Sequence, residues 1–508
     1  IAAGTVAAPA AVAAPVADAA PAVEQVGDRA CLFLDDRFVA EQSGLTRTWH
    51  PGRPLPEPAV VGDAWDQWPH LFGSVVFDPQ EKLYRMWYSS IREGMFYAES
   101  QDGRVWQKPK LGLHDFNGSK ENNLVKSGVS LPNVILDPNE KDPAGRFKLF
   151  AWDHSSYNKE PKEDRANGHT LFRSRDGIHW ELAGKGVPGS LLAPEDRCAN
   201  FITPDTNQVI WDSIANRYLV TFRTYPKRWA LGEFEEGRRR SIGITTAERI
   251  TGPWQPIVTR VVVDEEDDRA AARAMRDVPA EWAKWAELYS MPTFTCGNHY
   301  IGLLSLIHVA RSPDGKTTTA NAPGGGDLQL AFSHDGMHWQ RPAERKPLIA
   351  PSDAADLHPV YAACSAPLER GDEICIYYAE ANSSHPTTAG PVAQIRAAAW
   401  RRDGFVSLVA AGQTPGVLTT QAIVFDGHHL EVNVQTEKEG QVRVALLAAD
   451  ATPLPGFEEA ACDPLRGKGI AHTVSWRGRK DLSRLKGTPV RVRMTLSDAQ
   501  IFSFRFSH

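Results

Sequence analysis

A repeated motif constrains the fold of this chain more than any other feature of its sequence. Ser-x-Asp-Gly-x-x-Trp occurs at residues 100–106, 174–180 and 333–339, and a shortened copy follows at 402–405. The four motif glycines are separated by 74, 159 and 68 residues, so the long interval spans about two periods. Residues 246–254 end in a related Gly-x-Trp where the missing copy is expected. Five recurrences at a nearly constant period indicate a repeat architecture.

Each repeat contains the elements of four short antiparallel strands. In the first repeat, residues 73–77, 83–88 and 95–100 have strand-like composition, and a fourth strand is expected to begin at Trp106, after the Asp-Gly turn. Four-stranded units that recur five times predict a five-bladed β-propeller. The β-rich run at 31–34 is expected to pair with the last blade and close the ring, because closure removes exposed sheet edges.

The Asp-Gly-x-x-Trp segments are expected to be structural. The aspartate of each Asp-Gly pair should accept hydrogen bonds from its own turn, and the turn should join the two outer strands of a blade. The tryptophan should pack between neighbouring blades. These expectations leave the catalytic or binding residues to be found elsewhere in each repeat.

The pattern changes along the chain in a way that predicts three parts. Residues 1–30 are rich in alanine and proline and are expected to form a linker. Residues 31–415 are expected to form the propeller, which would carry the catalytic site, and residues 416–508 to form a β-sandwich. The predicted fold class is therefore all-β, a five-bladed β-propeller followed by a C-terminal β-sandwich. Residues 263–276 interrupt the repeats and are expected to form a short helix with acidic residues at its start.

Composition excludes several classes of function. The formal net charge is only −6, and no basic stripe indicates a nucleic-acid partner. No apolar run approaches the roughly 20 residues of a membrane helix. The six cysteines show no Cys-x-x-Cys spacing, so buried free thiols are expected and no cofactor is predicted, while a metal is neither indicated nor excluded. The linker-like beginning is typical of a secreted or periplasmic protein.

Carboxylates stand where a propeller would place its chemistry. The innermost strand of each blade lines the central channel, so residues just before these strands meet at one mouth of the channel. Asp66, Asp205 and Glu287 precede or begin the predicted first, third and fourth blades. Glycosidic cleavage needs two carboxylates, one to protonate the leaving oxygen and one to attack the sugar or activate water. We predict Glu287 as the general acid, Asp66 as the nucleophile or base, and Asp205 as a neighbour that tunes the acid.

Aromatic, basic and amide side chains accompany these carboxylates on or beside the predicted inner strands. Such side chains line sugar pockets, where apolar faces and a few placed polar groups bind the ligand together. The predicted substrate-binding residues are Trp68, His70, Asn207, Arg223, Tyr289, His308, His358, Tyr361 and His385.

Short segments along residues 31–508 resemble a group of secreted bacterial proteins described as family-32-like. These segments are residues 32–36 (Leu-Phe-Leu-Asp-Asp), residues 86–88 (Met-Trp-Tyr), the Asp-Gly-x-x-Trp turns, and the ending at 456–476. The group is related in architecture to glycoside hydrolase families 32, 43 and 68. Residues 287–294 are similar in form to the segment that carries the acid/base glutamate of family 32. The resemblance implies a glycoside hydrolase that cleaves an oligo- or polysaccharide.

Two other functions remain open on the same fold. A non-catalytic carbohydrate-binding propeller would have an aromatic pocket with at most one carboxylate. A glycoside phosphorylase or transferase would have a cluster of arginine, lysine or histidine that holds phosphate beside one acid. A hydrolase needs two carboxylates that face each other across the channel mouth.

Overall fold

The computed structural model describes residues 23–508 apart from 91–93, 117, 154–167, 184–206, 225–238, 320–325, 350–356, 383–391 and 411–413. The chain divides into two compact units. One comprises residues 48–407, and the other combines residues 1–47 with residues 408–508. This division differs from the predicted start of the propeller at residue 31, because the described residues 31–47 group with the C-terminal unit.

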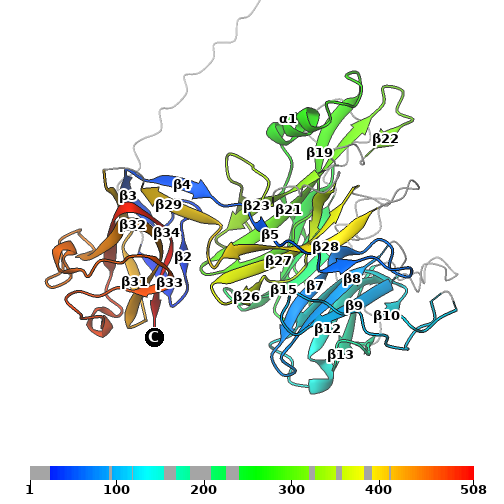
Figure 1. The fold of residues 1–508 in the computed structure, drawn as a ribbon, viewed down its shortest axis with the longest axis horizontal. Coiled ribbons are helices and arrows are strands. Elements are labelled where there is room, and N and C mark those ends of the chain that lie inside the picture. Colours follow the sequence, from blue (N-terminus) through cyan, green and yellow to red (C-terminus); the bar gives the residue numbers. More distant parts are fainter. Residues whose placement is uncertain are drawn as a thin grey trace, which may run out of the picture. The chain divides into compact units, whose positions relative to one another are not determined.

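The larger unit is a five-bladed propeller, so the predicted blade count is confirmed (Figure 1). Blades one to three are four-stranded antiparallel sheets. The strands of blade one are β7 (His70–Asp78), β8 (Leu83–Ser89), β9 (Gly94–Ser100) and β10 (Leu124–Ser127). Those of blade two are β11 (Val129–Leu136), β12 (Phe147–Asp153), β13 (Gly168–Ser174) and β14 (Glu181–Leu182). Those of blade three are β15 (Asn207–Asp212), β16 (Arg217–Thr224), β17 (Ser241–Ala247) and β18 (Val258–Val261).

Blades four and five carry additional short strands. Blade four consists of β19 (Ala283–Ser290), β20 (Thr293–Cys296), β21 (His299–Arg311), β22 (Thr318–Thr319), β23 (Gly326–Ser333) and β24 (Trp339–Gln340). Blade five consists of β25 (His358–Ala362), β26 (Leu368–Arg370), β27 (Glu373–Ala381) and β28 (Ala393–Arg401), completed by β5 (Arg53–Pro54) and β6 (Val60–Val61) from the start of the unit.

The ring is closed by a different segment from the one predicted. β5 and β6 pair with β28 on the outer side of blade five, with Pro54 opposite Ala398 and Val60 opposite Ile395. Residues 31–34 were expected there, but β2 (Cys31–Leu32) pairs with a strand of the other unit. Pro54 suits an outermost strand, because proline is tolerated only where the sheet needs no further amide donor.

The Asp-Gly turns of the three complete motifs are stabilised by their own side chains, as predicted. The Ser174 hydroxyl accepts from the Gly177 amide (2.9 Å), and the Asp176 carboxylate accepts from the amides of Ile178 (2.9 Å) and His179 (2.8 Å). The copies at 100–106 and 333–339 repeat these bonds. The glycines at 103, 177 and 336 have φ of +65°, +75° and +74°, a region that favours glycine. The turns at 177 and 336 join the third and outermost strands, which confirms that part of the prediction.

Neighbouring blades are joined through these turns. Trp87 of blade one donates its indole N–H to the Gly177 carbonyl of blade two (2.7 Å), and Arg85 donates to the Asp176 carbonyl (3.0 Å). Arg217 of blade three donates in the same way to the Asp335 carbonyl of blade four (2.8 Å). The motif tryptophan Trp180 meets Trp87 edge-on at 6.4 Å. The turn of one blade is thus packed and hydrogen-bonded against the second strand of the blade before it.

Polar side chains on the inner strands form hydrogen bonds between blades around the channel. The Ser74 hydroxyl of blade one donates to the Cys364 carbonyl of blade five (3.1 Å), and the Asn133 amide of blade two donates to the same carbonyl (2.7 Å). Asn133 accepts in turn from the Val209 amide of blade three (2.7 Å). Asn133 is fully buried, so its role is to hold the strands in register around the channel.

The predicted inserted helix is present as α1 (Glu265–Ala274), which follows blade three. Asp264 caps its first turn and forms a capping box with Asp267, as the acidic start of the segment favours. The buried Asp267 accepts two bonds from Arg341 (2.8 Å each), which lies beyond the outermost strand of blade four, and pairs with Arg345 (3.1 Å). Paired guanidinium contacts of this kind fix geometry, so α1 is anchored to blade four.

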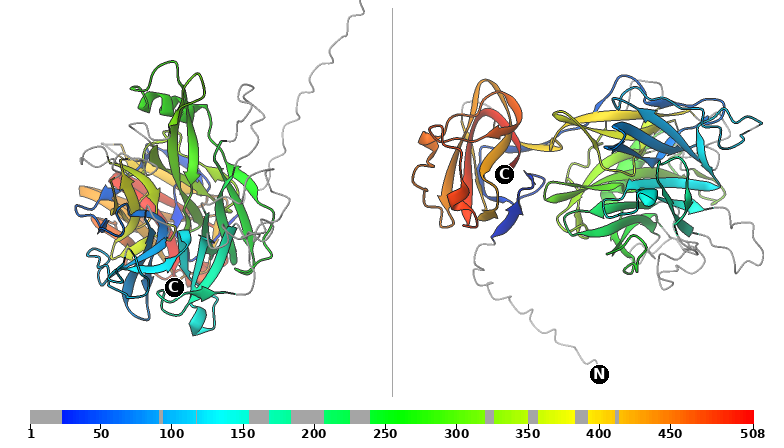
Figure 2. Two further views of the ribbon diagram at one scale, coloured as in Figure 1. Left: turned by 90° about the vertical axis from the view of Figure 1, so that its right-hand side faces the viewer. Right: turned by 90° about the horizontal axis from the view of Figure 1, so that it is seen from below.

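The second unit is also all-β and encloses one hydrophobic core. It contains β1 (Glu24–Gly27), β2, β3 (Val39–Ser43), β30 (Gly416–Thr420), β31 (Ile423–Phe425), β32 (His429–Ala448), β33 (Lys468–Thr473) and β34 (Val490–Ser507), with β4 (Thr46–Trp49) and β29 (Val406–Ala410) at its junctions with the other unit. Figure 2 shows the unit as layered strands. Cys31 and Phe33 are fully buried here, and the Phe33 and Phe504 rings lie 6.0 Å apart. Residues 31–34 are all buried, although their side chains alternate between the two faces of the strand. Such a segment fits the interior of the sandwich better than the exposed edge of a propeller blade.

Four of the five described cysteines are buried, and Cys296 is partly exposed. The described cysteines are all free, and burial raises the pKa of Cys364 to about 12. Cys198 lies outside the described residues. The described part of the chain contains no helix with the length and apolar character needed to cross a membrane.

Candidate active site

The innermost strand of blade four, β19, carries a carboxylate between two aromatic residues. Trp285, Glu287 and Tyr289 alternate along β19, so they point to one side of the strand, while Ala286 and Leu288 pack into the core on the other side. Glu287 is 6% exposed. Burial of a carboxylate between two aromatic residues lowers the stability of the fold unless hydrogen bonds or an ion pair compensate for the lost water.

The Glu287 carboxylate is held by two donors. Arg240, just before the third strand of blade three, donates to Oε2 at 2.5 Å. Trp285 donates its indole N–H to Oε1 at 2.8 Å. Hydrogen bonds between a guanidinium and a carboxylate are among the strong ones in proteins, so Arg240 and Trp285 together fix the orientation of the Glu287 carboxylate.

An aromatic cluster lies beside this carboxylate. The Tyr289 ring lies 5.6 Å from Phe72 of blade one and 5.2 Å from Tyr361 of blade five. The guanidiniums of Arg223 and Arg240 lie 4.7 and 5.7 Å from the centre of the Tyr289 ring. Burial and the neighbouring Tyr289 raise the pKa of Tyr361 well above its ordinary value, and the two guanidiniums oppose this shift. Side chains from blades one, three, four and five therefore meet at one place.

Two predicted residues of blade one extend this cluster. Trp68 and His70 are nearly buried, with their rings 4.6 Å apart, and the His70 ring meets Phe72 edge-on at 5.5 Å. His70 Nδ1 lies 3.2 Å from the Trp68 carbonyl oxygen, which can only accept. Ring contacts thus link Trp68 and His70, through Phe72, to Tyr289. Tyr361 and Arg223 contact the same Tyr289 ring, two positions along β19 from Glu287.

Asp66 belongs to a different network. Its fully buried carboxylate pairs with Lys108 (3.0 Å), which follows the Asp-Gly turn of blade one, and accepts from the Tyr88 hydroxyl (2.5 Å) at the end of β8. Asn123 donates to the same hydroxyl (2.8 Å). Burial and then the Asp66 charge raise the pKa of Tyr88. These partners come from the second strand of blade one and beyond it, and the role of Asp66 as nucleophile or base stays a prediction.

The inserted helix α1 forms hydrogen bonds with the residues that precede Arg240 and Glu287 in the chain. Asp268 of α1 accepts from Arg239 (2.7 Å) and from the backbone amide of Ala286 (3.0 Å) through the same oxygen. Arg239 and Ala286 are the direct chain neighbours of Arg240 and Glu287. One carboxylate therefore ties together the two backbone segments that carry the ion pair.

The remaining predicted residues lie elsewhere or outside the described part of the chain. His308, nearly buried on β21, lies opposite Ala286 and acts electrostatically on Asp327, whose pKa is raised by burial and lowered in part by His308. His358 begins β25 and is partly exposed. Asp205, His385 and the side chain of Asn207 lie outside the described residues.

Sequence reasoning missed three contributors to the site. Trp285 is not among the predicted site residues, yet its indole N–H donates to the Glu287 carboxylate. Phe72 lies just before the strand predicted at residues 73–77, whereas the structure includes it in β7, where its ring contacts those of His70 and Tyr289. Asp268 was interpreted as a charge that suits the helix dipole, and no local pattern indicates its partners.

Comparisons with known proteins concern the fold. No known family profile matches the sequence, and no curated protein matches it. Among solved structures, a thermostable family-43 glycoside hydrolase gives a TM-score of 0.44 at 13% identity, over 71% of this chain and 98% of its own. An endo-arabinase from Bacteroides thetaiotaomicron gives 0.37 at 12% identity, over 68% of this chain and 96% of its own. An exo-β-1,3-galactanase from Phanerochaete chrysosporium gives 0.35 at 9% identity, over 90% of this chain and 99% of its own.

These neighbours are glycoside hydrolases. At such low identity they bear on the architecture alone. The chemistry of this chain has to be argued from the residues at its channel mouth.

Proposed function

We propose that this protein is a secreted glycoside hydrolase that acts on an oligo- or polysaccharide at the mouth of its propeller channel. The observation that carries the proposal is the placement of Glu287, a buried carboxylate between Trp285 and Tyr289 on an inner strand, beside two arginines. Aromatic walls with a few convergent polar groups are typical of a sugar site.

The geometry suggests a change in the role of Glu287. The Arg240 contact requires a charged carboxylate, so Glu287 as it stands suits attack on the anomeric carbon or activation of water. The general-acid role predicted from the sequence would require Arg240 to move when the sugar binds. Because the Asp66 carboxylate is held by Lys108 and Tyr88, we propose Asp205 as the partner of Glu287.

A second function is favoured by one specific observation. Arg223 and Arg240 both lie over the Tyr289 ring, next to a single carboxylate among the described residues of the mouth. Two guanidiniums beside one acid could hold inorganic phosphate in the place of the attacking water, as a glycoside phosphorylase requires. The protein would then release a sugar 1-phosphate.

One experiment separates these functions. The purified protein is incubated with arabinan, xylan and β-1,3-galactan, and with small chromogenic glycosides, in the presence and absence of inorganic phosphate. Free sugar formed without phosphate supports the hydrolase, whereas sugar 1-phosphate formed only with phosphate supports the phosphorylase. Binding with no product in either condition, equal in the parent and in Glu287→Gln, would show a non-catalytic binding propeller.

A further inference from the structure

A second hollow lies between blades two and three, at the far end of the inner strands from the channel mouth. It has a volume of about 580 Å³ and is lined by the turn after β11, by β13 and β14, and by the connection from β17 to β18. This volume is within the range of about 300–1,000 Å³ in which small-molecule sites fall. We call it the blade-2/3 pocket.

The pocket exists where the repeated motif is broken. At the preceding interface the Asp-Gly turn fits so closely that a Cβ on Gly177 would lie 2.5 Å from the Trp87 ring. Blade three has Glu248, Arg249, Ile250 and Thr251 in place of that turn. These residues line an open space where the other turns pack against the blade before them.

The second strand of blade two is altered in the same place. Lys148 lies opposite Ile135 as Arg85 lies opposite Val76, so the two basic residues hold corresponding positions. Arg85 reaches across to the next blade, whereas Lys148 pairs with Glu140 of its own blade at 2.5 Å. Both sides of the interface therefore lack the contact that fills it elsewhere.

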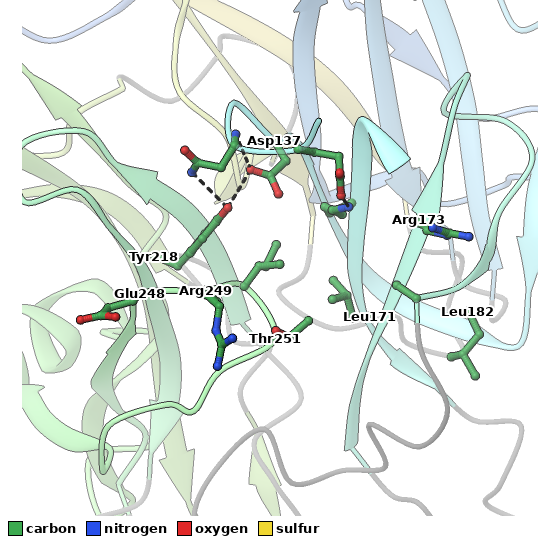
Figure 3. A pocket seen from close by; sticks show the side chains of 13 residues that line it. Asp137, Leu171, Arg173, Leu182, Tyr218, Glu248, Arg249 and Thr251 are labelled. Atoms are coloured by element: carbon green, nitrogen blue, oxygen red, sulfur yellow. Dashed lines mark hydrogen bonds and ion pairs between the residues drawn. The ribbon is translucent and has the colours of Figure 1, made fainter. Parts of the chain in front are cut away.

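The lining combines apolar and polar surface in a way that suits a sugar. Figure 3 shows Leu171 and Leu182 on the blade-two side, facing Tyr218 and Arg249 on the blade-three side. Leu182 is 48% exposed, so its apolar side chain can be reached by a ligand. The Tyr218 hydroxyl is held by the Asp137 carboxylate at 2.7 Å.

The charges of the pocket balance. Three basic and three acidic side chains line it, namely Lys148, Arg173, Arg249, Asp137, Glu140 and Glu248. Within the described part of the chain, the exposed side chains of Glu248 and Arg249 make no hydrogen bond or ion pair, so a donor and an acceptor are open to a ligand. A neutral ligand with many hydroxyls and apolar C–H faces matches this surface better than an anion or a cation.

We propose that the blade-2/3 pocket is a second carbohydrate-binding site, which holds a saccharide chain apart from the channel mouth. The identity of the ligand as a carbohydrate rests on the proposed function. A polysaccharide held at two places on one protein is bound more tightly than at either place alone, because the second contact is made at a high effective concentration.

The test is affinity electrophoresis of the full chain in gels that contain arabinan, xylan or β-1,3-galactan. The pocket variant is Glu248→Ala with Arg249→Ala, and the matched control is Glu265→Ala with Arg269→Ala, an exposed pair on α1 that also loses one charge of each sign. We expect the pocket variant to bind the retarding polysaccharide about tenfold more weakly, since two polar contacts are lost. The control should bind like the parent.

Leu182→Ser provides a second variant that tests the apolar wall, with the same expected direction. Equal retardation of parent and pocket variants would overturn the proposal, as would an absence of retardation by all three polysaccharides. Loss of retardation in Glu287→Gln together with normal retardation of the pocket variant would place all binding at the channel mouth. Hydrolysis of a small glycoside, measured in parallel, tests the proposed function separately, because the pocket variant should keep it.

Discussion

Replacing Glu287 by glutamine is expected to weaken the fold as well as the activity. The carboxylate accepts from two donors, Arg240 at Oε2 and the Trp285 indole at Oε1. A glutamine amide has one oxygen and one NH₂ group, so in either orientation one of these donors faces another donor. The substitution, usually chosen as structurally silent, therefore leaves one N–H without an acceptor at a site that is 6% exposed.

The loss of stability can be estimated from this one N–H group without an acceptor. A buried donor without an acceptor costs about 1–3 kcal/mol, so the free energy of unfolding should fall by about 2 kcal/mol. For a unit that spans residues 48–407, with an unfolding entropy of about 2 cal/mol/K per residue, this corresponds to a melting temperature lower by about 3 °C. Turnover should fall by about 100-fold or more, as for loss of a reacting carboxylate.

Calorimetric melting and a double-mutant cycle check this reasoning. Trp285→Phe removes the indole donor, so a glutamine at 287 can turn its oxygen to Arg240, and the cost of Glu287→Gln should shrink by about 1–2 kcal/mol in that background. Activity should stay low in the double variant. Glu265→Gln, whose side chain is 80% exposed, is the control and should melt with the parent. Additive effects of the two substitutions would refute the shared-carboxylate geometry.

Three further predictions concern the support of the site and the turns. Asp268→Ala should lower kcat about tenfold with a smaller change in KM, because the two backbone segments that carry the ion pair lose their common acceptor; an unchanged kcat would show that α1 does not position the site. Gly177→Ala should destabilise the fold by about 1–3 kcal/mol more than Gly118→Ala in chemical denaturation, since both have positive φ but only Gly177 has a close neighbour, the Trp87 ring. Burial raises the pKa of Asp176, but the backbone and side-chain hydrogen bonds of its turn lower it to about 2, so its contribution is present above about pH 4 and is lost towards pH 2. The stability difference between the parent and Asp176→Asn should therefore vanish over that interval, and a constant difference would contradict the assignment.

The blades could be predicted because their defining signal is local. An Asp-Gly turn needs only residues within a few positions of one another, and the hydrogen bonds from Asp176 to the next two amides show why the motif recurs unchanged. The closure of the ring is not a local property. Residues 31–34 and residues 53–61 both precede the first blade, and only the distant partners Phe504 and Ala398 decide which of them joins the sandwich and which the propeller.

The site could be predicted in part for a similar reason. Inner strands converge on the channel whatever their sequence, so reasoning from strand order brought Trp68, His70, Glu287 and Tyr289 to one place. Asp66 also precedes an inner strand, but its direction is set by Lys108, 42 residues further along the chain. Side-chain pairs of this separation leave no trace in spacing or composition, which is why the partner of Glu287 could not be assigned from the sequence.

The departures from the repeat gather around blade three, and this grouping connects the fold to the proposed sites. Blade three alone lacks the Asp-Gly turn, which opens the blade-2/3 pocket on one side. The helical insertion follows the same blade and ends at β19, where it ties the segment before Glu287 to the one before Arg240. Arg223 and Arg240 come from blade three as well. The blade that keeps the strands of the repeat but not its turn therefore supplies residues to both proposed sites.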